Sequence, residues 1–222
     1  MSAPLRRPQA IIFDWDNTLV DSWALIQAAM NVTLTAMGHA PWDMDETKRR
    51  VAHSAKNAFP ALFADRWEEA RDIFYHEYEA QHLERLTPLP GTAAMVEELY
   101  NRGLYLAVVS NKQGRLLREE AARLGWDRWF RRLVGATDAA HDKPSPAPVH
   151  LALEEIASIG EAPIWFVGDA EIDMECARNS GCIPVLLRAE SRRSGEFSRF
   201  APEIHFSRCD ALLTALSESA VP

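Results

Sequence analysis

The chain has 222 residues, of which 47% are hydrophobic and 25% are charged, and these proportions are typical of a folded globular protein. The formal net charge of -8 argues against nucleic acid as the main partner. No apolar run is long enough to span a bilayer, and residues 1–9 lack the pattern of a signal peptide. We therefore expect a cytoplasmic protein with no membrane partner.

The cysteines indicate the same compartment. Cys176, Cys182 and Cys209 have neither the spacing of a metal finger nor that of a redox motif. We expect reduced, mostly buried thiols, as is usual in the cytoplasm.

The first predicted element is a buried strand at Ala10–Phe13, a continuous apolar run. Apolar residues at steps of three and four then predict a helix over residues 23–38, and a second helix from about Asp65. Residues 43–60 are polar and less regular. No strand is predicted in residues 22–88, so we expect this segment to be an all-helical insertion after the first strand.

The pattern changes after this insertion. Further strands are predicted at residues 104–110, 132–136, 163–168, 183–187 and 203–206, with helical patterns between them. Strands that alternate with helices are typical of a parallel sheet covered on both faces. We therefore predict an α/β protein, in which residues 1–21 and 89–222 form a Rossmann-like, doubly wound parallel sheet. Residues 22–88 would form the separate helical domain.

Polar side chains follow four of the predicted strands. They are Asp14 and Asp16; Ser110, Asn111 and Lys112; Asp142 and Lys143; and Asp169 and Asp173. Ligands of open parallel sheets bind at the carboxyl ends of the strands. Because four separate strand ends deliver such groups to one edge of the sheet, we expect the functional site there.

The aspartates predict a metal ion at this edge. Asp14, Asp16 and Asp169 cannot gather in a buried site unless a cation joins them. Mg²⁺ suits a site with few protein ligands, since it also binds waters and a phosphate. Asp173 lies one helical turn beyond Asp169 and is placed to reach the same site or to hold metal-bound waters. Lys143 would add a fixed positive charge, and Ser110 would donate a hydrogen bond. A phosphoryl group with charged oxygens needs both.

With these residues in this order, the chain resembles members of the haloacid dehalogenase superfamily, in particular those of its phosphoglycolate phosphatase-like subfamily. The likeness spans about residues 9–190. It rests on four motifs in order: "DWDNT", Ser110 with Asn111, Lys143, and "GDAEID". The helical insertion matches the mobile cap domain of that family.

The resemblance implies roles for the site residues. Asp14 would attack phosphorus and form an aspartyl-phosphate, and Asp16 would act as general acid and then as general base. Thr18 and Ser110 would bind the phosphoryl group, as would backbone amides near Trp15 and Asn111. The implied phosphatase would act on a small phosphorylated metabolite.

The resemblance also implies how the cofactor is held. Mg²⁺ would bind the Asp14 carboxylate, the Asp16 carbonyl oxygen and Asp169, with Asp173 in support. Lys143 would steady Asp14 and the transferring group. Asp16 itself argues for phosphoryl chemistry, because a dehalogenase expels a halide and needs no second aspartate. Asn17 replaces the usual glycine of the motif, and asparagine is the next most tolerant residue at positive φ.

The cap residues are less specific. His53, Lys56 and Asn57 are candidates to contact the leaving group of the substrate, and an ordinary solvated turn is the alternative for the same residues.

Several functions share this core. The leading hypothesis is a phosphatase, with phosphoglycolate as the first substrate to test. A phosphomutase resembling β-phosphoglucomutase would carry a histidine where this chain has Ile26, which disfavours that reaction. A pyrophosphatase, a nucleotidase or a non-catalytic binding protein remain as alternatives. We expect a monomer or a homodimer.

Overall fold

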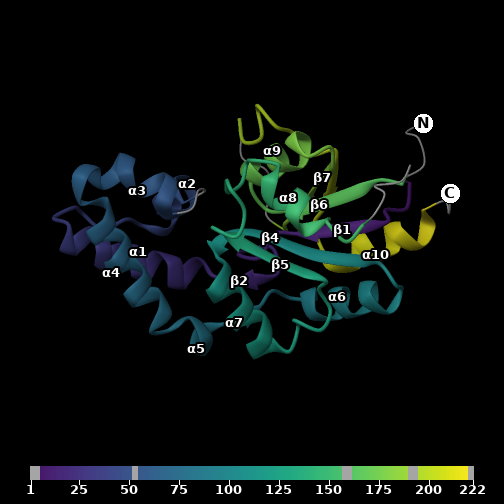
Figure 1. Ribbon diagram of the computed structural model, residues 1–222, viewed down its shortest axis with the longest axis horizontal. Helices are drawn as coiled ribbons and strands as arrows, with labels where there is room; N and C mark the ends of the chain where they lie inside the picture. Colours follow the sequence, from purple (N-terminus) through teal and green to yellow (C-terminus); the bar gives the residue numbers. More distant parts are fainter. Residues whose placement is uncertain (1–5, 52–54, 157–161, 190–194, 220–222) are drawn as a thin grey trace. The chain divides into compact units, whose positions relative to one another are not determined.

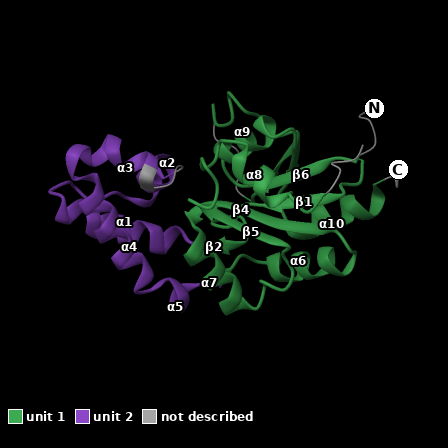
Figure 2. Ribbon diagram, viewed as in Figure 1, with its two compact units in different colours: residues 1–20, 88–222 green, residues 21–87 purple. Residues whose placement is uncertain are grey.

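The computed structural model describes residues 6–51, 55–156, 162–189 and 195–219 (Figure 1). The chain divides into two compact units, shown in Figure 2: residues 1–20 with 88–222, and residues 21–87. The chain passes from one unit to the other in two short strands, β2 (Val20–Asp21) and β3 (Thr87–Pro88), which pair with each other. The sequence analysis missed both strands, because two residues are too few to show an alternating pattern.

The first unit is built on a six-stranded parallel sheet. Its strands are β1 (Ala10–Phe13), β4 (Tyr105–Gln113), β5 (Arg132–Ala136), β6 (Ile164–Gly168), β7 (Ile183–Leu187) and β8 (Ile204–Phe206). They lie in the order β5-β4-β1-β6-β7-β8. The predicted α/β fold with a parallel sheet is confirmed. β1 pairs with β4 on one side and with β6 on the other, so the carboxyl end of β1 is the switch point where such sheets bind ligands.

Burial explains the continuous apolar run of β1. Ala10, Ile11, Ile12 and Phe13 are completely buried, because the strand has neighbours on both sides and lies inside a sheet flanked by helices (Figure 1). The turn after the strand contains Asn17 at a φ of 63°. This confirms that the position needs a residue that tolerates the left-handed region.

The helices of the first unit alternate with its strands, as the sequence predicts, and one of them ends earlier than its apolar spacing indicates. They are α6 (Thr92–Asn101), α7 (Gly114–Leu124), α8 (Ala147–Ala152), α9 (Glu171–Asn179) and α10 (Cys209–Glu218). Apolar spacing extends the α8 pattern to Ile156, but the helix ends at Ala152. A longer helix would place Glu154 and Glu155 at its negative end, and both instead pair with Arg132.

In the described part of the second unit, the regular structure is helical apart from two strand residues. Its α-helices are α1 (Trp23–Ala36), α2 (Met44–Arg50), α3 (Ala55–Phe63), α4 (Trp67–Glu79) and α5 (His82–Arg85). α2 and α3 occupy the stretch that the sequence suggested was irregular. α2 begins at Asp43, whose side chain accepts a hydrogen bond of 2.7 Å from the Glu46 N–H, a common N-cap. Within the described part of the chain, no helix has the length and hydropathy of a bilayer-spanning segment.

Candidate active site

Asp14 continues directly from β1 at the switch point of the sheet. Its N–H donates to the Val167 carbonyl at 2.8 Å, so its main chain is fixed between β1 and β6. The residue is only 7% exposed. A carboxylate buried to this extent needs a charged or hydrogen-bonding partner.

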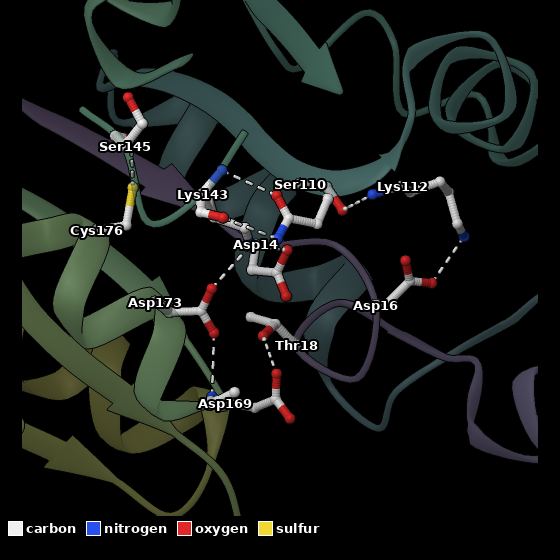
Figure 3. A network of polar contacts seen from close by, with 12 residues as sticks. Asp14, Asp16, Thr18, Ser110, Lys112, Lys143, Ser145, Asp169, Asp173 and Cys176 are labelled. Carbon is white, nitrogen blue, oxygen red and sulfur yellow. Dashed lines mark hydrogen bonds and ion pairs between the residues drawn. The ribbon is translucent and has the colours of Figure 1, made fainter. Parts of the chain in front are cut away.

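Lys143 is that partner, and it links two carboxylates (Figure 3). Its ammonium lies 2.7 Å from Asp14 Oδ1 and 2.8 Å from Asp173 Oδ1, and the residue is buried. The main chain of Lys143 is held in turn by the Asn111 amide, which accepts from the Lys143 N–H at 3.0 Å and donates to its carbonyl at 3.3 Å. Asn111 therefore connects the end of β4 to the loop that carries Lys143.

Asp173 is fixed by the start of α9. Its Oδ2 accepts from the Ala170 N–H at 3.0 Å, which satisfies one donor at the helix N-terminus. Its side chain lies over Gly168, where an added Cβ would come within 2.4 Å of it. Glycine at the end of β6 is therefore required for this packing. Because both oxygens of Asp173 already accept hydrogen bonds, the structure points to Asp173 as a residue that holds Lys143 in place.

Three carboxylates meet at this point. Asp14, Asp169 and Asp173 offer oxygen atoms that all lie within 4.8 Å of one another. Burial raises the pKa of Asp14 to about 7, with Lys143 opposing the shift and Asp173 adding to it. Burial also raises the pKa of Asp169 well above its usual value, and the charges of Asp173 and Asp14 add to that rise.

The pKa shifts of Asp14 and Asp169 bear on whether a metal ion fits between these carboxylates. The pKa values of Asp14 and Asp169 rise mainly because both groups are buried, and the neighbouring carboxylates add to a rise that the Lys143 ammonium only partly opposes. Oxygen donors with excess negative charge are the donor set that Mg²⁺ prefers. Asp14 and Asp169 therefore fit a divalent cation. The Asp16 side chain is not part of this cluster, which leaves only its carbonyl oxygen as the predicted ligand.

The predicted phosphate-binding hydroxyls lie at the same edge of the sheet. Thr18 donates to Asp169 Oδ1 at 3.2 Å, and Thr18 and Ser110 are both buried. The Ser110 hydroxyl accepts from the Lys112 N–H at 3.2 Å. That bond uses the oxygen of Ser110 and not its proton, so it does not consume the donor that a phosphoryl oxygen would need.

Asp16 belongs to a second polar network (Figure 3). Its Oδ1 lies 2.7 Å from the Lys112 ammonium, which also lies 2.6 Å from Glu120 Oε2. Trp15, whose ring is fully buried, donates to the same Glu120 oxygen at 2.7 Å. The sequence analysis noted Lys112 at its strand end but missed Glu120. One signal was present: Glu120 lies three and four residues after Leu117 and Leu116, on the apolar face of α7.

The predicted substrate-binding residues of the second unit cannot be placed in the same way. His53 lies outside the described residues. Lys56 is in α3, and its side chain likewise lies outside the described part. Asn57 is exposed and Ile26 is buried in α1.

Comparison with known proteins shows the family of this chain. A family model described as haloacid dehalogenase-like hydrolase matches residues 11–186. The chain belongs to this family. Among the haloacid dehalogenase-like hydrolases it is similar to the phosphoglycolate phosphatase of Neisseria meningitidis, with 32% identity over 83% of this chain and 82% of that protein. The phosphoglycolate phosphatase of Rhodospirillum rubrum is 31% identical over 81% of this chain and 79% of that protein.

A solved structure shows the same fold. A haloacid dehalogenase-like family hydrolase from Streptococcus pneumoniae superposes with a TM-score of 0.80 and 23% identity, over 92% of this chain and 96% of that chain. The family and its phosphatase relatives make this protein a hydrolase of the phosphatase type.

Proposed function

We propose that this haloacid dehalogenase-like hydrolase is a Mg²⁺-dependent phosphatase that cleaves a small phosphomonoester through an aspartyl-phosphate on Asp14. The observation that carries the proposal is the position of Asp14. It lies at the switch point of the sheet, its Oδ1 is held by Lys143 at 2.7 Å, and its neighbours include the carboxylate of Asp169.

In the first step, Asp14 is the nucleophile. Because Lys143 holds Oδ1, we assign Oδ2 as the attacking atom. A bond forms between this oxygen and phosphorus, and the bond from phosphorus to the leaving oxygen breaks. The electron pair stays on the leaving oxygen, which takes the proton of Asp16 and departs as an alcohol.

In the second step, Asp16 is a carboxylate and acts as the base. It takes a proton from a water molecule whose oxygen attacks phosphorus, and the bond between phosphorus and Asp14 breaks. Inorganic phosphate leaves, Asp14 is an ionised carboxylate again, and Asp16 carries the proton for the next cycle. Each step therefore moves one proton through Asp16, and the two steps restore both residues.

The other residues hold charge in place. Bound Mg²⁺ would neutralise negative charge on the phosphoryl oxygens and orient them. Asp14, the Asp16 carbonyl oxygen and Asp169 would hold it, with Asp173 in support. Ser110, Thr18 and the main chain near Asn111 would bind the phosphoryl group. Lys143 would remain beside Asp14 and oppose the charge that develops during transfer.

We propose phosphoglycolate as the first substrate to test, because relatives with 32% and 31% identity are named phosphoglycolate phosphatases. In the same proposal, the helical unit acts as the cap, and His53 and Lys56 contact the leaving group. Ile26 in place of a mutase histidine supports hydrolysis over phosphoryl return to a sugar. Cys176, Cys182 and Cys209 are free thiols, which supports a cytoplasmic location.

Phosphate release from a panel of phosphomonoesters tests the proposal. The panel contains phosphoglycolate, sugar phosphates, nucleotides and pyrophosphate, each with Mg²⁺ and with a chelator. Asp14→Asn serves as the blank, and Asp210→Asn is the matched control because Asp210 is an exposed surface carboxylate paired with Arg208. Release that requires both Mg²⁺ and Asp14 supports the proposal. Release that persists in Asp14→Asn would refute it.

A further inference from the structure

Glu120 is a buried carboxylate that the proposed reaction does not use. It lies on the apolar face of α7, and its side chain is 1% exposed. Burying a carboxylate costs several kcal/mol unless charged or hydrogen-bonding partners compensate. Its Oε2 accepts two hydrogen bonds, one from the Lys112 ammonium at 2.6 Å and one from the Trp15 indole at 2.7 Å.

These bonds close a ring around the turn that follows β1. Lys112 extends from Glu120 to Asp16 Oδ1 at 2.7 Å, while Trp15, the residue just before Asp16, binds the same Glu120. Two consecutive residues of the turn are therefore tied to one carboxylate on a different element. The Trp15 indole is fully buried and packs edge-on against Trp126 and Phe130. The Trp15 side of this hydrogen-bonded circuit therefore has little freedom to move.

These hydrogen bonds affect the position of the Asp16 carboxylate, because Asp16 is less confined than Asp14. Its side chain is 18% exposed and it lies in a turn rather than in the sheet, so other rotamers are open to it. Proton transfer requires the donor and acceptor atoms to lie within hydrogen-bond distance. A group that fixes the Asp16 carboxylate would therefore affect the step in which the leaving oxygen takes its proton.

We propose that Lys112, anchored by Glu120, is the positioning residue for Asp16. The proposal rests on the phosphatase mechanism given above. Lys112 holds Oδ1 of Asp16, which directs Oδ2 towards the leaving oxygen in the first step and towards the attacking water in the second. Glu120 holds Lys112 and neither it nor Lys112 exchanges a proton with the substrate.

The test compares two kinds of leaving group. An alkoxide, as in phosphoglycolate or the best substrate of the panel, needs a proton to depart, whereas 2,4-dinitrophenolate departs without one. The value of kcat/KM covers the steps up to formation of the aspartyl-phosphate, so it reports this proton transfer and not the later hydrolysis. We would measure it for both substrates in Lys112→Met and Glu120→Gln. Glu119→Gln is the matched control, because Glu119 is the adjacent residue and pairs with exposed Arg115.

For Lys112→Met we expect kcat/KM to fall by about 10- to 100-fold for the alkoxide substrate, a part of the 10²- to 10⁴-fold that general acid catalysis provides. The value for 2,4-dinitrophenyl phosphate should change by less than about 3-fold, since no proton is needed there. Glu120→Gln should show a smaller loss of the same kind, and Glu119→Gln should show none.

Equal losses on both substrates, or no loss in a folded Lys112→Met protein, would overturn the proposal. If Lys112→Met does not fold because Glu120 is left unpaired, the double variant Lys112→Met/Glu120→Gln removes both charges and the same ratio is measured. Failure of the phosphatase mechanism is distinguished by Asp14→Asn, which would then retain the turnover of the unmodified protein.

Discussion

Two buried lysines in the α/β unit each join two carboxylates, and their surroundings differ. Lys143 binds Asp14 and Asp173, and Asp169 adds a third carboxylate beside them. Lys112 binds Asp16 and Glu120. The same oxygen of Glu120 also accepts a hydrogen bond from the neutral indole of Trp15. The first group has a surplus of two negative charges if all acids are ionised, and the second has a surplus of one.

This difference separates two tasks within one active site. Burial, with the charges of neighbouring carboxylates added to it, raises the pKa of Asp14 and of Asp169 in the Lys143 group. The surplus of negative charge there fits a divalent cation, which would bring the charge close to balance. The Lys112 group is more nearly balanced within the protein, and it holds Asp16, the side chain that accepts and releases a proton in the proposed mechanism. A network that already satisfies its members orients a residue without requiring a metal ion.

The largest effect should come from the nucleophile. Asp14→Asn should lower kcat by at least about 10³-fold for every substrate, because an amide does not replace the attacking carboxylate. The circular dichroism spectrum should remain that of the unmodified protein. Asp210→Asn, the same chemical change on the surface, should leave kcat within about 2-fold.

Substitution of the two lysines should give different patterns of kcat/KM on the two kinds of substrate. Lys143→Met should lower kcat/KM for alkoxide and dinitrophenolate substrates alike, by about 10²-fold or more, because Lys143 acts on the transferring group itself. Lys112→Met should affect only the alkoxide substrate. Identical patterns in the two variants would mean that the comparison of the two lysine sites is wrong.

Mg²⁺ should stabilise the protein through the first group only. At a concentration of 100 times its dissociation constant, the ion should raise the free energy of unfolding by about 2.7 kcal/mol, which thermal denaturation with and without chelator would measure. Asp169→Asn should lose most of this stabilisation. Glu120→Gln should keep it, and an equal loss in both variants would contradict the assignment of the ligands.

The smallest effect concerns pH in the absence of metal. Burial raises the pKa of Asp14 in the folded protein to about 7, above its ordinary value of 3.8. Between pH 4 and 7 the folded protein therefore holds a proton that the unfolded chain has lost, so the free energy of unfolding falls as the pH rises through this window. Above pH 7 the Asp14 carboxylate is ionised in the folded protein, and the full free-energy cost of burying it lowers the free energy of unfolding.

Asp14→Asn should remove that cost. The metal-free variant should be more stable than the unmodified protein at pH 8, and this gain should shrink towards pH 4. Thermal denaturation at both pH values in the presence of a chelator provides the measurement. A variant that is less stable at pH 8 would show that contacts of the Asp14 carboxylate outweigh its burial.

The sequence by itself determined the architecture and the centre of the site. Apolar runs predicted the parallel strands because a strand buried on both faces has no polar positions. The carboxyl ends of those strands brought Asp14, Lys143, Asp169 and Asp173 to one edge, and this required only the rule that parallel strands end together. Positive φ was expected at Asn17 because this residue replaces the glycine that is usual in the motif of the family that the chain resembles, and few other side chains tolerate that region.

Other features depended on contacts between residues far apart in the chain. Glu120 lies 105 residues from Trp15, so its role could not be deduced from local spacing. The same holds for the end of α8, where Arg132 pairs with the acids that follow the helix. β2 and β3 exist only because two short segments meet. These features require tertiary structure because the partners of a buried charge, of an ion pair or of a short strand are selected by packing, and no local sequence pattern records them.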